Sequence, residues 1–291
     1  MMNVIVFGAN GQLGRTFQYL ENDYRDEFQF HFYSSNVADI SNVERLKQLK
    51  SDIVPDVVIN CAAYTKVDLA ETEVDLAYLV NVDGVRNLAQ VFQESMIVHY
   101  STDYVYHNEC AMPLKESDPL DPKGIYAKSK LLGEIELAKY ADNYLIMRTS
   151  WVYSPFGQNF VKTMLRLGKD NTELKIVNDQ IGCPTYTFDI VKASMELIKY
   201  HYNREEKRTT EVYNFANEGT ISWYDFAKVI FRFADVNIKL IPISSAEFNL
   251  IAPRPEWSKL NLQKVKNVLD TKIPHWLESI NHCLSHIKAN A

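Results

Sequence analysis

Short runs of β-branched and aromatic residues alternate with longer amphipathic segments through the first half of the chain. The runs that predict strands are residues 4–7, 28–33, 57–60, 97–100 and 144–148. Apolar residues at helical intervals predict helices over residues 13–20, 42–50, 74–93 and 126–140. This alternation is typical of repeated β-α units, so we expect an α/β fold with a doubly wound parallel sheet.

The pattern changes after about residue 153. Helices are predicted over 158–170 (ending at Gly168), 189–202 and 222–234 (with Ser222 as N-cap), and strands over 174–179 and 238–244 (strand-like up to Pro242). The polar run 203–211 predicts a solvated loop. We therefore expect a first domain over 1–153, completed by elements from about 174–216, and a smaller α+β region over 154–291.

Composition excludes several classes of protein. The chain has 291 residues, of which 46% are hydrophobic and 23% charged, and its net charge is -6. It has no sustained basic field, which argues against a nucleic-acid partner, and no apolar run near 20 residues, which argues against a membrane span. The chain begins without a charged segment or cleavage-site pattern before residues 4–7, so we expect a cytoplasmic protein.

The residues that most often bind metals are scattered. The four cysteines show no C-x-x-C pair, which predicts reduced and mostly buried thiols rather than a zinc site or a disulfide framework; they are Cys61, Cys110, Cys183 and Cys283. His282 and His286 stand at helical spacing, but no further ligand accompanies them. We predict no metal site.

A glycine-rich segment, GANGQLG at residues 8–14, follows the first predicted strand and opens the first predicted helix. Glycines at this spacing permit a tight turn, close approach of the backbone to a pyrophosphate and close helix packing, while the helix N-terminus stabilises the anion. Strand and helix flank it as a Rossmann-type NAD(P) site requires. We predict cofactor contacts from Gly8, Asn10, Gly11, Gln12, Leu13, Gly14 and Arg15.

The end of the second predicted strand favours one nicotinamide cofactor over the other. NAD sites usually place an acid there to bind the ribose hydroxyls. Here residues 33–36 read YSSN, and no carboxylate occurs until Asp39. Ser34 leaves room for a 2′-phosphate and Arg15 is a candidate counter-charge, so NADPH is favoured. NADH stays an alternative, because Ser34 and Ser35 could simply end the strand.

The segment GIYAKSK at residues 124–130 places one tyrosine before two lysines. In a helix, Lys130 returns to the face of Tyr126 whereas Lys128 points away. A nearby ammonium lowers a tyrosine pKa from about 10, which suits a general acid for a carbonyl oxygen. Taken alone, a Y-x-x-x-K pattern is more often a half-buried tyrosine beside solvated lysines.

Two further features support a catalytic site. Ser101 and Thr102 lie just past a predicted strand, where open α/β sheets bind ligands. A hydroxyl, a tyrosine and a lysine in this order could orient a carbonyl, protonate its oxygen and hold the nicotinamide ribose.

We expect the helix over 126–140 to bury a stripe made of Ala127, Leu131, Ile135 and Ala138, with Tyr126, Lys130 and Gly133 on a neighbouring face.

With these motifs, the chain resembles the extended short-chain dehydrogenase/reductase superfamily and, more narrowly, its dTDP-4-dehydrorhamnose reductase family. The matching segments are residues 8–14, 60–71, 99–105, 126–130, 148–153, 159–169, 178–185, 222–227 and 254–260. The resemblance implies NAD(P)H-dependent reduction of the C4 ketone of dTDP-4-dehydro-L-rhamnose, with residues 1–153 binding the cofactor and 154–291 mainly the sugar nucleotide.

The resemblance also implies individual residue roles. Thr102, Tyr126 and Lys130 would form the catalytic trio. Further cofactor contacts would come from Asp39, Ile40, Ala62, Ala63, Tyr64 and Asn81. The dTDP-sugar would be bound by Thr65, Val67, Thr102, Asp103, Tyr126, Trp151, Asn159 and Arg254. A tryptophan can cover an apolar sugar face and an arginine suits a diphosphate.

The chain departs from the family in two places. Some members form a dimer through Mg2+ held by carboxylates, but residues 14–17 (GRTF) and 186–188 (YTF) supply none. We therefore expect no Mg2+, and either a monomer or a metal-independent homodimer. The loop over 106–117 is also unusual because it carries His107 and Cys110.

Other interpretations stay open. The scaffold also resembles the β subunit of methionine adenosyltransferase, a non-catalytic NADP-binding regulatory subunit, although the intact trio favours an enzyme. A nucleotide-sugar epimerase on this fold would reduce and then reoxidise its bound cofactor. The stereochemistry at C4 and the nucleotide are not fixed by the sequence, so a related 4-ketosugar reductase also fits.

Overall fold

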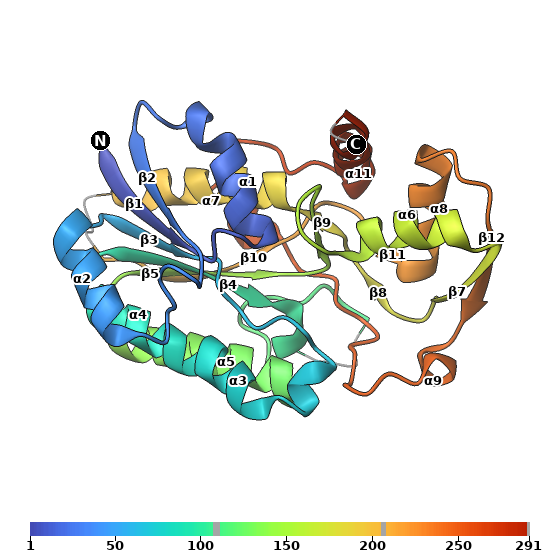
Figure 1. The fold of residues 1–291 in the computed structure, drawn as a ribbon, viewed down its shortest axis with the longest axis horizontal. Helices are drawn as coiled ribbons and strands as arrows, with labels where there is room; N and C mark the ends of the chain where they lie inside the picture. Colours follow the sequence, from blue (N-terminus) through green and yellow to red (C-terminus); the bar gives the residue numbers. More distant parts are fainter. Residues whose placement is uncertain (107–110, 205–207, 290–291) are drawn as a thin grey trace.

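Six parallel strands form the central sheet of the computed structural model, which describes residues 1–106, 111–204 and 208–289 (Figure 1). In spatial order these are β10 (Thr210–Phe215), β5 (Tyr144–Thr149), β4 (Met96–Thr102), β3 (Val57–Asn60), β1 (Met2–Phe7) and β2 (Phe28–Tyr33). Every neighbouring pair in this sheet is parallel. The predicted doubly wound sheet and its five N-terminal strands are confirmed.

The direction of the winding reverses beside β1. The chain passes from β1 to β2 on one side and then crosses to β3 on the other side. The connections that leave β1 and β3 therefore separate at the carboxyl ends of these strands. Such a point opens a crevice in which α/β proteins bind their ligands.

Helices cover both faces of the sheet (Figure 1). One face carries α1 (Gln12–Leu20) and α7 (Thr187–Tyr202), and the other carries α2 (Val43–Ile53), α4 (Gly84–Val91) and α5 (Gly124–Tyr140). The side chains of β1 divide between the two cores: Val4 and Val6 join one, Ile5 and Phe7 the other. Burial on both faces explains why the strand is apolar without alternation.

Helix α5 lies against a break in the preceding helical segment. The single helix predicted over 74–93 is divided into α3 (Val74–Tyr78), a π-helical turn, η3 (Leu79–Asp83), and α4. A Cβ atom on Gly133 would lie 2.2 Å from the carbonyl oxygen of Asn81. Only glycine therefore permits this approach of α5 to η3.

The buried stripe predicted for α5 is confirmed at Ala127, which is buried, and at Leu131, which is partly buried against the core, but it is wrong at Ile135 and Ala138. Ile135 is 50% exposed and Ala138 is exposed, whereas Lys130, Glu134 and Leu137 are buried. The face with Lys130 and Glu134 turns inward for two reasons. It carries Gly133, which permits close contact with Asn81, and its two charged side chains bond to Tyr100 of β4 and Arg148 of β5.

The second half of the chain adds smaller elements beside the sheet (Figure 1). They are α6 (Phe160–Asp170), α8 (Trp223–Phe233), α9 (Ser245–Phe248), α10 (Gln263–Lys266) and α11 (Trp276–Ala289), with strands β6 (Val152–Tyr153), β7 (Glu173–Val177), β8 (Ile181–Gly182), β9 (Thr185–Tyr186), β11 (Ile221–Ser222) and β12 (Lys239–Ile243). Short 3-10 turns are η1 (Glu21–Asp23), η2 (Leu69–Glu71) and η4 (Asp103–Val105). β7 pairs with β12, β8 with β11, and β6 with β9.

Local predictions in this half have mixed outcomes. The Ser222 hydroxyl accepts a hydrogen bond from the Asp225 backbone N–H and caps α8, as predicted. The prediction that α6 ends at Gly168 is wrong, since the helix continues to Asp170. A Cβ on Gly168 would lie 2.4 Å from the ring of Phe231, so this glycine serves packing between α6 and α8 instead.

Several sequence features fall partly outside the described residues. His107 and Cys110 lie outside them, as do residues 205–207 of the predicted polar loop. The other three cysteines are free thiols, with Cys183 and Cys283 buried. Within the described ranges, no helix combines the length and the apolar character needed to cross a membrane.

Substitution of Gly133 by alanine should destabilise the fold by about 1–3 kcal/mol, because the added methyl group overlaps the Asn81 carbonyl. Urea denaturation measures the loss. Gly84→Ala is the matched control, since its methyl group would overlap only a side chain, that of Ile40 at 2.6 Å, and would stay 3.4 Å from the nearest backbone atom, the Leu79 carbonyl oxygen, so it should cost less. Equal stability of Gly133→Ala and the native protein would contradict this account of the α5 contact.

Candidate active site

A cavity of about 460 Å³ opens where β1 and β3 end, at the reversal of the winding. Its walls include many of the predicted cofactor residues, namely Gly8, Asn10, Gly11, Asp39, Ile40, Ala62, Ala63 and Tyr64. Thr65, predicted to contact the substrate, lies in the same wall, and Ser35 lines it where Ser34 was predicted. The structure thus brings residues from three separate strand ends to one place.

The three glycines of the loop have different surroundings. Gly8 has a φ of +75°, and a Cβ there would lie 2.5 Å from the Ala62 nitrogen. A Cβ on Gly14 would lie 2.4 Å from the Gly8 carbonyl oxygen. Gly11 is exposed, and the atom nearest to a Cβ added there would be the Gly8 carbonyl oxygen, at 3.3 Å. Gly8 and Gly14 therefore fold the loop, and Gly11 leaves the cavity side open to a ligand.

Four residues predicted from the same segment do not line the cavity. Leu13 packs against the core, and Gln12 accepts a hydrogen bond from the Asn159 side chain at 3.0 Å. The guanidinium of Arg15 lies 5.1 Å from the centre of the Phe156 ring, and Arg15 does not line the cavity that Ser35 and Asp39 line. The fourth is Gly14, which is buried under the loop.

Asn81 is buried behind the cavity rather than in its wall. Its side-chain oxygen accepts from the Tyr64 backbone N–H at 2.8 Å, and its nitrogen donates to the Tyr64 carbonyl and to the Ser129 hydroxyl, both at 3.0 Å. The Ser129 hydroxyl in turn donates to the Tyr126 carbonyl at 2.8 Å. Asn81 therefore ties the cavity wall after β3 to the first turn of α5.

Thr102 and Tyr126 meet at the end of β4. The Thr102 hydroxyl donates to the Asp103 carboxylate at 3.0 Å, and the ring of Tyr126 stands edge-on to that of Tyr104 at 5.7 Å. Burial raises the pKa of Tyr126 to about 12, and a hydrogen bond with Thr102 offsets part of this rise. The phenol is therefore protonated at neutral pH and lies within reach of the hydroxyl.

Lys130 is buried beneath this pair, 2% exposed. Its Nζ donates to the Tyr100 carbonyl oxygen at 2.7 Å and lies 3.2 Å from Nε2 of His99. Burial lowers the Lys130 pKa to about 8, and Glu134 partly offsets the effect. The expectation that Lys130 lowers the Tyr126 pKa is corrected: that pKa is raised, because burial of the phenol dominates and the lysine points to β4.

A buried ion pair lies one turn further along α5. Arg148 of β5 donates to both carboxylate oxygens of Glu134, at 2.6 to 3.1 Å, and the Ser101 hydroxyl donates to the same carboxylate. The sequence interpretation assigned no role to this pair. An arginine inside the apolar strand 144–149, with a glutamate four residues after Lys130, is the signal that could have found it.

Asp103 is the most unusual polar group at the site. It is 2% exposed, and its Oδ2 atom has no hydrogen-bond partner among the described residues. Burial raises the pKa of this carboxyl to about 7, with hydrogen bonds from Thr102 and Ser258 acting in the opposite direction. An unpaired buried oxygen beside Thr102 can accept a hydrogen bond from a bound molecule.

Arg254 reaches the site from far along the chain. It forms a 2.7 Å ion pair with Asp68, and its guanidinium lies 6.0 Å from the centre of the Tyr104 ring. Its positive charge lowers the pKa of Tyr126, though less than burial raises it. Val67, beside Asp68, is half-buried. Arg254 therefore belongs to the cluster around Thr102 and Tyr126.

Trp151 and Asn159 take different positions. Trp151 has a φ of +46° and stacks on Trp223 with ring centres 3.6 Å apart. Trp223 was not predicted as a site residue, although it lies in a segment matched to the family. Asn159 caps α6 by accepting from the Lys162 backbone N–H and donates to Gln12, so it lies at the glycine loop.

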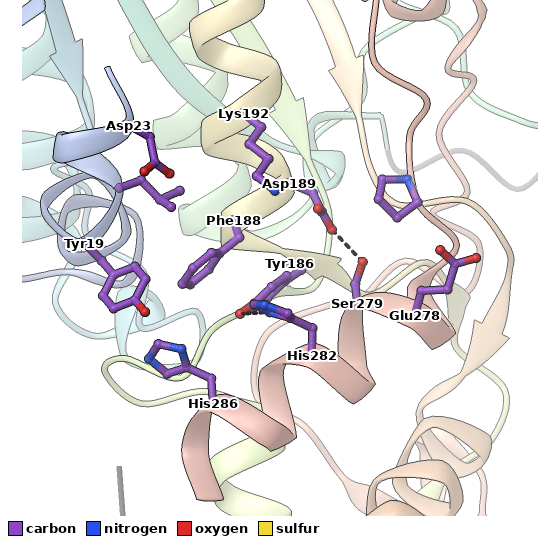
Figure 2. Close-up of a pocket in the computed structure, with 12 residues that line it drawn as sticks. Tyr19, Asp23, Tyr186, Phe188, Asp189, Lys192, Glu278, Ser279, His282 and His286 are labelled. Atoms are coloured by element: carbon purple, nitrogen blue, oxygen red, sulfur yellow. Dashed lines mark hydrogen bonds between the residues drawn. The ribbon is translucent and has the colours of Figure 1, made fainter. Parts of the chain in front are cut away.

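A second cavity, of about 380 Å³, lies between α1, α7 and α11 (Figure 2). His282 and His286 lie here against an aromatic group that includes Tyr19, Tyr186 and Phe188. The Tyr186 hydroxyl is 3.0 Å from His282 Nδ1, and the Ser279 hydroxyl donates to Asp189 at 2.6 Å. Two pairs of polar groups that line this cavity are thus hydrogen-bonded to each other.

This second cavity also contains the region where carboxylates for a metal-linked dimer would be expected. Phe188 lines it, and Arg15 lies over Phe156, whose ring stacks on Phe188. Among the described residues, no group of three or more His, Cys, Asp or Glu side chains could hold a metal ion.

Comparisons with known proteins show the family to which this chain is similar. The sequence model of the family described as RmlD substrate binding domain matches residues 2–289. The chain is 34% identical over 295 residues to dTDP-4-dehydrorhamnose reductase of Escherichia coli K12, covering 98% of both chains. It is 37% identical over 290 residues to the protein of that name from Aggregatibacter actinomycetemcomitans, covering 97% of this chain and 98% of the other. A solved structure of dTDP-4-dehydrorhamnose reductase from Bacillus anthracis, in complex with NADP, aligns with a TM-score of 0.91 at 37% identity, covering 98% and 99% of the two chains.

The raised pKa of Asp103 predicts a pH-dependent stability difference. Between about pH 4 and pH 7 the unfolded chain releases this proton while the folded chain keeps it, so the contribution of Asp103 to stability falls as the pH rises. Asp103→Asn should therefore gain about 2–4 kcal/mol relative to the native protein across this interval. Urea denaturation at a series of pH values measures the difference, and parallel stability curves would contradict it.

Proposed function

Because this chain belongs to the RmlD substrate binding domain family of the extended short-chain dehydrogenases/reductases, and is thus a nicotinamide-dependent oxidoreductase, we propose that it reduces dTDP-4-dehydro-L-rhamnose to dTDP-L-rhamnose. The observation that carries the proposal is the pair of Thr102, which is buried, and Tyr126, which is partly buried and is linked through Ser129 and Asn81 to Tyr64 in the wall of the glycine-loop cavity. A hydroxyl and a protonated phenol together can polarise and then protonate a ketone oxygen.

The cofactor we propose is NADPH, with NADH as a weaker substitute. It supplies the hydride that the C4 carbon of the sugar accepts. The fit rests on Gly11, which faces the cavity without steric obstruction, and on Ser35 in the wall where many NAD sites carry an acid. Lys66 lines the same cavity and adds a positive charge.

In the proposed mechanism, Thr102 turns its hydroxyl proton from the Asp103 carboxylate to the C4 ketone oxygen, and Tyr126 gives its proton to that oxygen as it becomes an alkoxide. A phenol with a pKa of about 12 keeps its proton at neutral pH, yet it is a far stronger acid than the alcohol formed, so the transfer is favourable. Lys130 would hold the nicotinamide ribose by donating a hydrogen bond to a ribose hydroxyl.

The sugar nucleotide would be bound by groups from both halves of the chain. Arg254 is placed to meet the diphosphate, where it would exchange its contact with Asp68 for charge-assisted hydrogen bonds. The stacked indoles of Trp151 and Trp223 offer an apolar surface for the deoxysugar or the base. The unpaired Asp103 oxygen would accept a hydrogen bond from a sugar hydroxyl.

We further propose that the two parts of the chain bind different ligands, as expected from the sequence. Residues 1–153, together with α7 and β10, would bind the cofactor, and the remainder of 154–291 would bind the sugar nucleotide. The region around Arg15 and Phe188 offers an arginine and aromatic rings instead of carboxylates, which supports a monomer or a dimer formed without Mg2+.

Tyr126→Phe should lower kcat by at least about 100-fold while leaving the Kd for NADPH within about threefold, because only the proton donor is removed. NADPH oxidation with enzymatically prepared dTDP-4-dehydro-L-rhamnose measures kcat, and product identification fixes the stereochemistry at C4. Tyr140→Phe, at the far end of the same helix, is the control and should behave as the native protein. Undiminished turnover in Tyr126→Phe would exclude this mechanism, and absence of net NADPH consumption by the native protein would favour an epimerase or a regulatory subunit.

Ser35→Asp should reduce kcat/KM for NADPH by at least about tenfold and change that for NADH little, because the new carboxylate repels a 2′-phosphate. Steady-state kinetics with each cofactor gives the two values. Ser35→Asn is the neutral control of the same size and should preserve the preference for NADPH. Equal losses with both cofactors would place the 2′-phosphate elsewhere.

A further inference from the structure

The first turn of α5 carries the proposed proton donor, since the helix begins at Gly124 and Tyr126 is its third residue. The first four backbone N–H groups of a helix have no partner inside it, and a neighbouring side chain usually accepts from one of them. Lys123 stands at the N-cap, and among the described residues its side chain makes no capping hydrogen bond. The first turn also contains no acidic residue. The start of α5 therefore depends on an acceptor from another element.

Glu71 supplies this acceptor. It ends η2, the short turn between β3 and α3, and stands 54 positions before Ile125. Its Oε1 atom accepts a hydrogen bond from the Ile125 N–H at 2.8 Å. A carboxylate suits this place because the N-terminus of a helix carries a partial positive charge. Glu71 thus caps α5 from outside the helix.

Gly124 makes room for the Glu71 carboxylate. It has a φ of +74°, and a Cβ atom there would lie 2.7 Å from Glu71 Oε1 and 3.3 Å from Cδ of Pro253. A larger residue at this position would push the carboxylate away from the helix. Pro253 precedes Arg254, so the capped end of α5 lies beside the segment whose arginine is proposed to bind the diphosphate.

The segment that carries Glu71 also shares a small apolar cluster with α5. Tyr64, Ala70 and Ala77 form the buried centre of this cluster, and Ile125 and Tyr126 pack against it. Ala70 is 0% exposed and directly precedes the capping glutamate. η2 therefore contacts the start of α5 through an apolar side chain and through a carboxylate.

The other contacts of α5 act further along the helix. The Tyr126 carbonyl accepts from the Ser129 hydroxyl, Lys130 donates to β4, and Glu134 bonds to Arg148 of β5. None of these bonds engages an N–H group of the first turn. Without Glu71, residues 124–126 should fray while the rest of the helix keeps its place.

We propose that Glu71 is a positioning residue, which caps α5 from η2 and thereby holds the Tyr126 phenol beside Thr102. The inference rests on the proposed function, in which Tyr126 gives its proton to the ketone oxygen. That transfer requires the two oxygens to lie about 3 Å apart, so a displaced first turn slows the chemical step without weakening cofactor binding.

The position of the Tyr126 ring can be measured without substrate, by NMR of the full-length protein with 13C-labelled tyrosine rings. The signals of Tyr126 are assigned by their loss in Tyr126→Phe. Because the Tyr104 ring stands edge-on to it at 5.7 Å, the chemical shifts of the Tyr126 ring depend on the separation of the two rings. Glu71→Ala should change these shifts, and Glu71→Gln, which keeps an oxygen acceptor, should change them less.

Asp75→Ala is the matched control, because it removes an exposed acid from the first turn of α3, four residues further along the chain. It should leave the Tyr126 signals unchanged. Unchanged signals in Glu71→Ala overturn the proposal. If Glu71→Ala does not fold, Glu71→Asp takes its place, since its carboxylate is one methylene group too short to reach the Ile125 N–H.

Kinetics test the catalytic consequence. Glu71→Ala should lower kcat for NADPH oxidation by about 10- to 100-fold and leave the Kd for NADPH within about threefold. Glu71→Gln should stay within about fivefold of the native kcat, because it loses only the charge. In the Tyr126→Phe background, Glu71→Ala should lower kcat by no more than about twofold, because its effect acts through the hydroxyl already removed.

Full multiplication of the two losses in the double variant would mean that Glu71 stabilises the site in general, and it overturns the proposal. The ring signals require neither substrate nor turnover. Failure of the native protein to oxidise NADPH with the 4-keto sugar would therefore contradict the proposed function, while the ring signals still decide whether Glu71 positions Tyr126.

Discussion

The buried ion pair between Glu134 of α5 and Arg148 of β5 fixes the geometry on which the site depends. Two charges in the core are costly unless each is fully hydrogen-bonded. Here Glu134 accepts from Arg148 and from Ser101, and Arg148 also donates to Tyr106 and to the Glu116 carbonyl. Any rotation of α5 would break several of these bonds together. The face that carries Lys130 and Tyr126, about one and two helical turns before Glu134, is thereby held toward the end of β4.

The parts of the fold that could be predicted are those set by local pattern. Residues 57–60 are buried on both faces and are apolar up to Asn60, whereas residues 28–33 alternate phenylalanines with more polar side chains. Both strands were predicted with the observed bounds. The burial of α5 was predicted wrongly because hydrophobicity points to Ile135, whereas the actual contact depends on Gly133 and on charge partners supplied by β4 and β5. Partners of that kind are distant in sequence and leave no periodic signal.

In the site, too, short local motifs could be predicted from the sequence, whereas contacts between distant residues could not. The glycine loop and the order of Thr102, Tyr126 and Lys130 are visible as short motifs. The hydrogen bond between Glu71 and the Ile125 N–H joins residues 54 positions apart, so no short motif contains it. Likewise, Lys130 was expected to act on the Tyr126 phenol through its charge. In the folded chain, desolvation outweighs that effect and Lys130 bonds to the Tyr100 carbonyl.

The place of β10 in the sheet has a consequence for how the molecule is assembled during synthesis. β10 pairs with β5 along its whole length, yet α6, α7 and several short strands lie between them in the sequence. Until β10 leaves the ribosome, β5 is an open edge with unpaired backbone groups, and closing the intervening loop carries an entropic cost. The cofactor-binding sheet therefore cannot be completed as an autonomous N-terminal unit, and the two halves of the chain must mature together.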